Sequence, residues 1–162
     1  MKKRWLCLFV ENEIGVLARV SGLFAGKSYN LNSLTVGPTE DETISRMTIS
    51  LYSDDKVFEQ IQKQLNRSVE VIKVLDFSEV YIHTREIMYL RVIQCAPEEK
   101  NEVFRLAEVY KLRMVDYGSQ DVILESVKKE DKNSFLLEVF SDCFPNRIEA
   151  VRGGSVAMEG IR

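Results

Sequence analysis

Histidine and cysteine are scarce in this chain, and their scarcity excludes several kinds of active site. The only histidine, His83, has no nucleophile and orienting group arranged around it, so we interpret it as a solvated residue of a connecting segment. The cysteines form no C-x-x-C pair and have no histidine at ligand spacing, which argues against a zinc site. Because Cys7, Cys95 and Cys143 each have an apolar neighbour in the sequence, we expect three buried, inert thiols.

An excess of positive charge and a long apolar run are also missing. The 22 basic and 25 acidic residues give a net charge of -3, which would repel a nucleic-acid backbone. The apolar run behind the basic residues 1–4 stops at Val10, too short for a signal peptide or a membrane span. We therefore expect a cytoplasmic protein that binds neither nucleic acid nor membrane.

The first half of the chain alternates between the apolar periodicities of strands and helices. The pattern predicts strands over 5–10, 29–36, 47–51 and 69–75, and helices over 16–25 and 54–65. Gly26 supplies a stop for the first helix, and Asp54 and Asp55 supply acid at the start of the second. In the third strand Arg46, Thr48 and Ser50 alternate with apolar residues, so we expect them to face solvent.

The second half repeats this order of elements more faintly. Strands are predicted over 87–93, 112–117, 122–127 and 148–158, the last broken at Gly153-Gly154, with a helix after Pro97 and a short helix from Glu130. Side-chain identity between the halves is slight, so the repeat rests on element order. We predict two domains, 1–78 and 79–162.

Two right-handed crossovers in each half lead to the ferredoxin-like βαββαβ arrangement, and the predicted fold class is α+β with two such domains in tandem. In this topology the first and third strands are central and the second strand is an edge. The second strand carries the polar residues Asn30, Asn32 and Ser33. An unpaired edge can accept a second copy of itself, so we expect a homodimer formed through edge strands or helices.

The residues best suited to bind a ligand gather where the first strand meets the first helix, at Glu11 to Leu17. A helix N-terminus exposes unpaired backbone N–H groups that favour a carboxylate. Gly15 permits a close approach to that backbone, and the Asn12 amide can bond to either end of a zwitterion. The alternative interpretation is that Asn12 simply caps the helix and Gly15 eases the turn.

Longer motifs around this joint resemble a known family. They are Val-Glu-Asn-Glu-x-Gly-Val-Leu-x-Arg-Val over 10–20, Gly-Leu-Phe over 22–24, Tyr-Asn-Leu-Asn-Ser-Leu-Thr-Val-Gly-Pro-Thr over 29–39 and Ser-Arg-Met-Thr-Ile over 45–49. Together they resemble the small regulatory subunit of acetohydroxyacid synthase, also called acetolactate synthase, and the likeness extends from Arg4 to Leu75 and resumes at Arg85. The second half departs further from the family, with Lys111-Leu112 for the usual Arg-Gly or Arg-Ala and Arg152-Gly153-Gly154 for the usual Arg-Thr-Gly.

The resemblance implies that the first domain is an ACT domain, a module that binds a small amino acid at a dimer interface. It implies that Asn12 and Gly15 hold the carboxylate and amino groups of the effector and that Asn30 reaches in from the partner subunit. Ile14, Val16 and Leu17 border the same joint. The expected effector is a branched-chain amino acid, with valine favoured.

The resemblance also implies a catalytic large subunit that uses thiamine diphosphate, magnesium and FAD to condense pyruvate with a second 2-keto acid. We expect none of these cofactors and no catalytic residue in this chain, because no Gly-rich phosphate loop follows a strand. An acylphosphatase would need such a loop where Glu11 to Ile14 stand, and an RNA-recognition fold would need exposed aromatics on its central strands. A stand-alone ACT-type sensor that controls a different protein is the alternative function.

Overall fold

The computed structural model describes residues 1–27 and 29–161, which form two compact units. Unit 1 comprises residues 1–83 and the segment from Ser155 onward, and unit 2 comprises residues 84–154. Each unit contains one four-stranded sheet, with strand orders β2-β3-β1-β4 and β6-β7-β5-β8. Both are the ferredoxin-like order, with the first and third strands of the unit in the centre. The predicted fold class is thereby confirmed.

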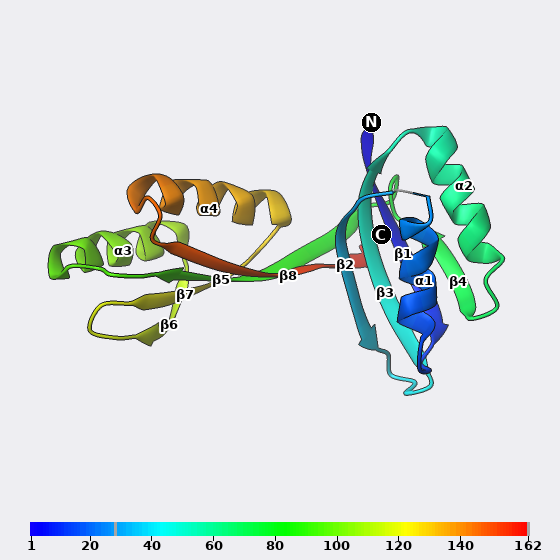
Figure 1. Cartoon of the computed structure of the whole chain (residues 1–162), viewed down its shortest axis with the longest axis horizontal. Helices are drawn as coiled ribbons and strands as arrows, with labels where there is room; N and C mark the ends of the chain where they lie inside the picture. Colours follow the sequence, from blue (N-terminus) through cyan, green and yellow to red (C-terminus); the bar gives the residue numbers. More distant parts are fainter. Residues whose placement is uncertain (28, 162) are drawn as a thin grey trace. The chain divides into compact units, whose positions relative to one another are not determined.

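Unit 1 has two helices on one face of its sheet (Figure 1). Its elements are β1 Lys2–Glu11, α1 Val16–Ala25, β2 Leu31–Pro38, β3 Ile44–Ser53, α2 Asp55–Asn66 and β4 Val71–Asp76. The predicted N-cap of α2 is present, since the Asp54 carboxylate accepts a 2.8 Å hydrogen bond from the Val57 N–H. The inward residues of β1 and β3 and the apolar stripes of both helices form one core, which includes Leu6, Leu8, Val20, Ile49, Phe58 and Leu65.

The opposite face of this sheet is also covered, which overturns one prediction. We expected Thr48 and Ser50 to face solvent, yet their exposed fractions are 4% and 0%. The reason is tertiary: Ala157, at the end of the chain's last strand, packs with Phe77 and with Cys7 of β1. Cys7 lies directly opposite Thr48 in the β1–β3 ladder, so the cover extends over the polar row of β3.

Hydrogen bonds fix the last strand to this face of the unit 1 sheet. The Arg46 guanidinium donates to the Ala157 carbonyl at 2.8 Å, and the Ser155 N–H donates to the Ser33 hydroxyl at 2.9 Å. The Thr35 hydroxyl donates in turn to the Ser155 carbonyl at 3.2 Å. Polar side chains of β2 and β3 therefore bond a returning segment of the same chain.

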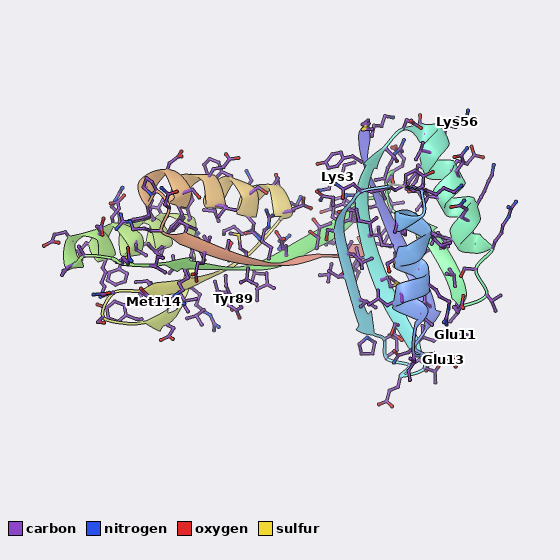
Figure 2. All side chains as sticks on the ribbon, in the orientation of Figure 1. Lys3, Glu11, Glu13, Lys56, Tyr89 and Met114 are labelled. Carbon is purple, nitrogen blue, oxygen red and sulfur yellow. The ribbon has the colours of Figure 1, made fainter. Side chains whose placement is uncertain are left out.

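Unit 2 also places both helices on one face of its sheet (Figure 1). The elements of the second half are β5 Ile82–Val92, α3 Pro97–Tyr110, β6 Arg113–Tyr117, β7 Val122–Lys128, α4 Glu130–Cys143 and β8 Ile148–Glu159. Helix α4 has 14 residues, the same length as α3, and is longer than the short helix that we predicted. On the helix-free face, the side chains of Tyr89 and Met114 project away from α3 and α4 (Figure 2).

The boundary between the units differs from the predicted boundary of 1–78 and 79–162. Strand β8 runs without interruption through Gly153 and Gly154, but the unit boundary falls directly after Gly154, whose φ of 78° is left-handed. Residues after this glycine belong to unit 1 because they pack on its sheet. The expected connector residue His83 lies within β5 and is exposed.

The prediction of buried thiols holds for two of the three cysteines. Cys7 and Cys95 are buried, and burial raises the pKa of both thiols. Cys143, the last residue of α4, is exposed. Among the described residues, no helix combines the length and the apolar character needed to cross a membrane.

We predict that a charge placed under the returning strand destabilises the protein. Ala157→Asp buries a carboxylate beside Cys7 and Phe77, and we expect it to lower the free energy of unfolding by about 3 kcal/mol. Met158→Asp is the matched control, since Met158 is 63% exposed and its substitution should change the value by less than about 0.5 kcal/mol. Urea denaturation measures both, and equal effects would show that the segment does not cover the sheet in solution.

Candidate functional site

A cavity of about 280 Å³ lies in unit 1 where β1 leads into α1 and where β2 leads into β3. Its lining combines apolar side chains with a few polar groups: Val10, Glu11, Asn12, Glu13, Val16, Leu17, Val36, Gly37, Pro38, Ser45 and Met47. The volume lies just below the range of drug-sized pockets and therefore suits a ligand with few non-hydrogen atoms. The apolar walls can take a small branched side chain, and the polar groups can orient charged ends.

Gly15 is the residue that begins helix α1. It is the N-cap, in the left-handed conformation with φ 85° and ψ -7°, and no side chain among the described residues caps the helix there. The amides of the first turn of a helix lack partners within the helix. Together with the positive end of the helix dipole, they form a site that favours an anion.

Asn12 does not cap the helix, so the alternative interpretation of this residue is wrong. Its side-chain N–H donates to the Glu42 carbonyl at 2.8 Å, and its backbone N–H donates to the Thr43 carbonyl at 2.8 Å. These bonds tie the end of β1 to the loop between β2 and β3. Asn12 is thus held at the cavity with its side-chain carbonyl oxygen unpaired among the described residues.

The other predicted site residues of the joint fall into two groups. Val16 and Leu17 line the cavity, Val16 with 2% and Leu17 with 44% of its surface exposed. Ile14 and Gly15 lie next to the cavity in sequence but are not part of its lining, and Ile14 is fully exposed. Gly15 therefore affects the cavity through its left-handed backbone conformation, which sets the start of α1.

Asn30 lies elsewhere in the chain's own structure. It lines a different cavity of about 560 Å³, together with residues that include Met1 and Asp54. In unit 1, Glu11 and Glu13 mark the end of the sheet that holds the Asn12 cavity, and Lys3 and Lys56 mark the opposite end (Figure 2). A single copy of unit 1 does not bring Asn30 to Asn12.

Arg19 is a residue of this region that sequence reasoning did not assign to the site. A Cβ at position 15 would lie 3.0 Å from Nη1 of Arg19, so this guanidinium covers Gly15. Arg19 Nε also lies 2.5 Å from Oε1 of Glu70. The pKa of the Glu70 carboxyl is lowered, first by its own backbone N–H, next by the Ser68 hydroxyl and then by Arg19. The sequence spacing could have indicated this contact, because Arg19 follows Gly15 by one helical turn.

The cavity residues of β2 and β3 were also missed: Val36, Gly37, Pro38, Ser45 and Met47. No local pattern marks them, because they reach the cavity only when the sheet brings the β2–β3 loop beside the end of β1. Within the part of the chain that the structure describes, no group of three or more His, Cys, Asp or Glu side chains could hold a metal ion.

Comparisons with known proteins agree along the whole chain. The family described as "AHAS small subunit-like ACT domain" matches residues 6–73, and the family described as "Small subunit of acetolactate synthase" matches residues 85–161. A probable acetolactate synthase small subunit of Archaeoglobus fulgidus is 41% identical over 156 residues, which cover 96% of each chain. The acetolactate synthase small subunit of Haemophilus influenzae is 35% identical over 96% of this chain and 94% of its own.

A solved structure extends this agreement to the fold. The crystal structure of the acetolactate synthase small subunit from Thermotoga maritima matches with a TM-score of 0.86 and 32% sequence identity. The match covers 100% of this chain and 99% of the other. The resemblance seen in the sequence motifs is thereby confirmed.

We predict that Gly15 and Gly22, two glycines of the same helix region, respond in opposite directions to alanine. Gly15→Ala forces a side chain into a left-handed conformation against Arg19 and should lower the free energy of unfolding by about 1–2 kcal/mol. Gly22 lies within α1 with open space around its Cα, so Gly22→Ala should raise the free energy by about 0.5–1 kcal/mol. Denaturant titration of both variants would contradict the assignment of Gly15 if its variant were as stable as the wild type.

Proposed function

The chain belongs to the family of acetolactate synthase small subunits, and from this premise we propose that it is the non-catalytic regulatory subunit of a cytoplasmic acetolactate synthase. In this role it activates a thiamine-diphosphate-dependent catalytic subunit and confers feedback inhibition by valine. The observation that supports the regulatory site is the 280 Å³ cavity at the start of α1, which joins apolar walls to a helix start with no side-chain cap. The Val16 N–H already donates to the Glu13 carbonyl at 3.3 Å, so the amides that follow Val16 in the first turn are the ones proposed to meet the ligand.

The cavity suits the chemistry of a branched-chain amino acid. The carboxylate of valine would lie at the amides after Gly15, where the helix dipole favours negative charge. The Asn12 carbonyl oxygen and the carboxylates of Glu11 and Glu13 suit the ammonium group. The isopropyl group would contact apolar residues of the lining, chiefly Val16 and Met47.

A homodimer formed through β2 would complete this site. Among the described residues β2 pairs only with β3, so its outer edge is available to a second copy. Antiparallel pairing of two β2 strands about their midpoint sets Leu31 of one copy opposite Pro38 of the other. This register carries Asn30 of the second copy to the Gly37-Pro38 end, which lines the Asn12 cavity. Asn12 and Asn30 line different cavities within one chain, and a site shared between two copies would bring them together.

Regulation follows if valine binds two arrangements of the small-subunit dimer with different affinity. Valine can shift the equilibrium only by its differential affinity for the two arrangements, and it favours the one that supports catalysis less well. A ligand with so few atoms is expected to bind with a Kd between roughly micromolar and millimolar. This range suits a sensor of a metabolite pool.

The activating role is tested by adding the chain to the purified catalytic subunit of the same organism. We expect the rate of acetolactate formation to rise with the concentration of the chain until it saturates, and valine to lower the saturated rate. If the chain activates the catalytic subunit but valine does not lower the rate, valine is not the effector. Valine binding without activation would instead favour a stand-alone sensor that controls another protein.

The shared site is tested by mixing two inactive variants. Calorimetry should show that Asn12→Ala and Asn30→Ala each weaken valine binding by about tenfold or more, since each loses a hydrogen bond to a charged group. Dimers that combine the two variants should regain one intact site, because one copy keeps Asn12 and the other keeps Asn30. Asn101→Ala, an exposed position on α3, is the control and should bind as the wild type does.

Loss of binding that mixing fails to restore would show that the two residues do not meet across a dimer. Gly15→Asp should abolish binding in the same titration, because it places a carboxylate near the position proposed for the ligand's own. Unchanged affinity in both Asn12→Ala and Gly15→Asp would remove the site assignment.

A further inference from the structure

We propose that unit 2 carries a docking cleft for an acidic segment of the catalytic subunit, an inference that rests on the proposed function. The cleft has a volume of about 560 Å³ and lies among the end of α3, the end of β7 and the start of α4. It is called the basic cleft here and is lined by Arg85, Val109, Tyr110, Lys111, Val127, Lys128, Lys129, Lys132, Phe135 and Leu136.

All of the charged side chains that line the basic cleft are cationic. Its lining contains one arginine and four lysines and no acidic residue. Among the described residues none of these five cations forms an ion pair, and the Arg85 guanidinium donates only to the neighbouring Thr84 carbonyl. The whole chain has a net charge of -3, so this cluster is a local feature and does not reflect a generally basic protein.

The other cations of unit 2 are all engaged. Each arginine outside the cleft is paired with a carboxylate, in the pairs Arg91–Asp121, Arg105–Glu102, Arg113–Glu125, Arg147–Glu99 and Arg152–Glu86. Lys100 is buried and donates to the carbonyls of Gly118 and Ser119. Unit 2 therefore concentrates its unpaired positive charge at the basic cleft.

Exposed apolar side chains share the cleft with these cations. Val109, Val127 and Phe135 are 60%, 54% and 50% exposed, and the Phe135 ring packs edge-on against Tyr110 with centroids 6.1 Å apart. An apolar centre with a charged rim is the usual composition of a protein interface. A small inorganic anion would neutralise the lysines and leave these apolar groups in water. The combination favours a partner segment that carries carboxylates around an apolar anchor.

The exposed lysines at the rim of the basic cleft predict how fast such a complex would form and dissociate. Exposed rim charges chiefly accelerate association and make it sensitive to salt, while apolar contacts at the centre slow dissociation. Charge reversal at Lys129 and Lys132 should therefore slow association with the catalytic subunit, and truncation of Phe135 should accelerate dissociation.

The experiment measures association of the full chain with the purified catalytic subunit by stopped-flow or surface plasmon resonance. The double variant Lys129→Glu/Lys132→Glu should lower the association rate constant by about tenfold at low salt, and the difference should shrink as salt screens the charges. Lys56→Glu/Arg67→Glu, at exposed positions of unit 1, makes the same change in net charge and should leave the rate near that of the wild type. Phe135→Ala should raise the dissociation rate constant several-fold.

The outcomes separate this inference from the proposed function. If the wild type activates the catalytic subunit and the Lys129→Glu/Lys132→Glu variant associates as quickly as the control, the basic cleft is not a docking site, and the proposed function stands. If the wild type neither binds nor activates the catalytic subunit, both proposals are overturned.

Saturable binding of pyrophosphate or ATP that is lost in the Lys129→Glu/Lys132→Glu variant, with unchanged association, would assign the cleft to a small anion and overturn the inference. Equal thermal unfolding midpoints of the variants and the wild type establish that folding is intact.

Discussion

The first turn of α1 carries backbone amides that no side chain among the described residues caps, and the proposed regulatory site depends on this constraint. Gly15 begins the helix in a left-handed conformation that a residue with a side chain adopts only with strain. Arg19 packs where a side chain at position 15 would lie. Asn12 is held beside the helix start by bonds to the β2–β3 loop, so it remains available to a ligand. The joint is thus shaped for an anion at a helix terminus.

The sheet of unit 1 is covered on both faces, and this burial fixes the position of the site. Helices α1 and α2 cover one face, and the segment after Gly154 covers the other with Phe77. Among the described residues the outer edges of β2 and β4 are unpaired, and β2 is the edge strand that Asn30 precedes. Pairing of two β2 edges is the step that would bring Asn30 of one copy to Asn12 of another.

Unit 2 shares the topology of unit 1 but differs in how its polar groups are arranged. Its arginines outside the basic cleft are paired with carboxylates, and the buried Glu86 accepts from both Arg152 and Asn133. The basic cleft is the exception, with unpaired cations beside exposed apolar side chains. The same fold therefore presents a small cavity with apolar walls in one unit and a larger cleft lined by cations in the other, because side chains and not topology determine function.

The sequence by itself determined the element order, the tandem ferredoxin-like topology, the helix start at Gly15 and the family. These are local properties: hydrophobic period, acidic residues before helices, and a glycine where the backbone turns. Tertiary structure alone decided that Thr48 and Ser50 are buried and that Gly37 and Ser45 line the cavity. It also decided where unit 1 ends, since the residues after Gly154 pack on the sheet of unit 1. The contacts of the last strand join residues more than a hundred positions apart, and no periodicity within either segment records which partner will cover it.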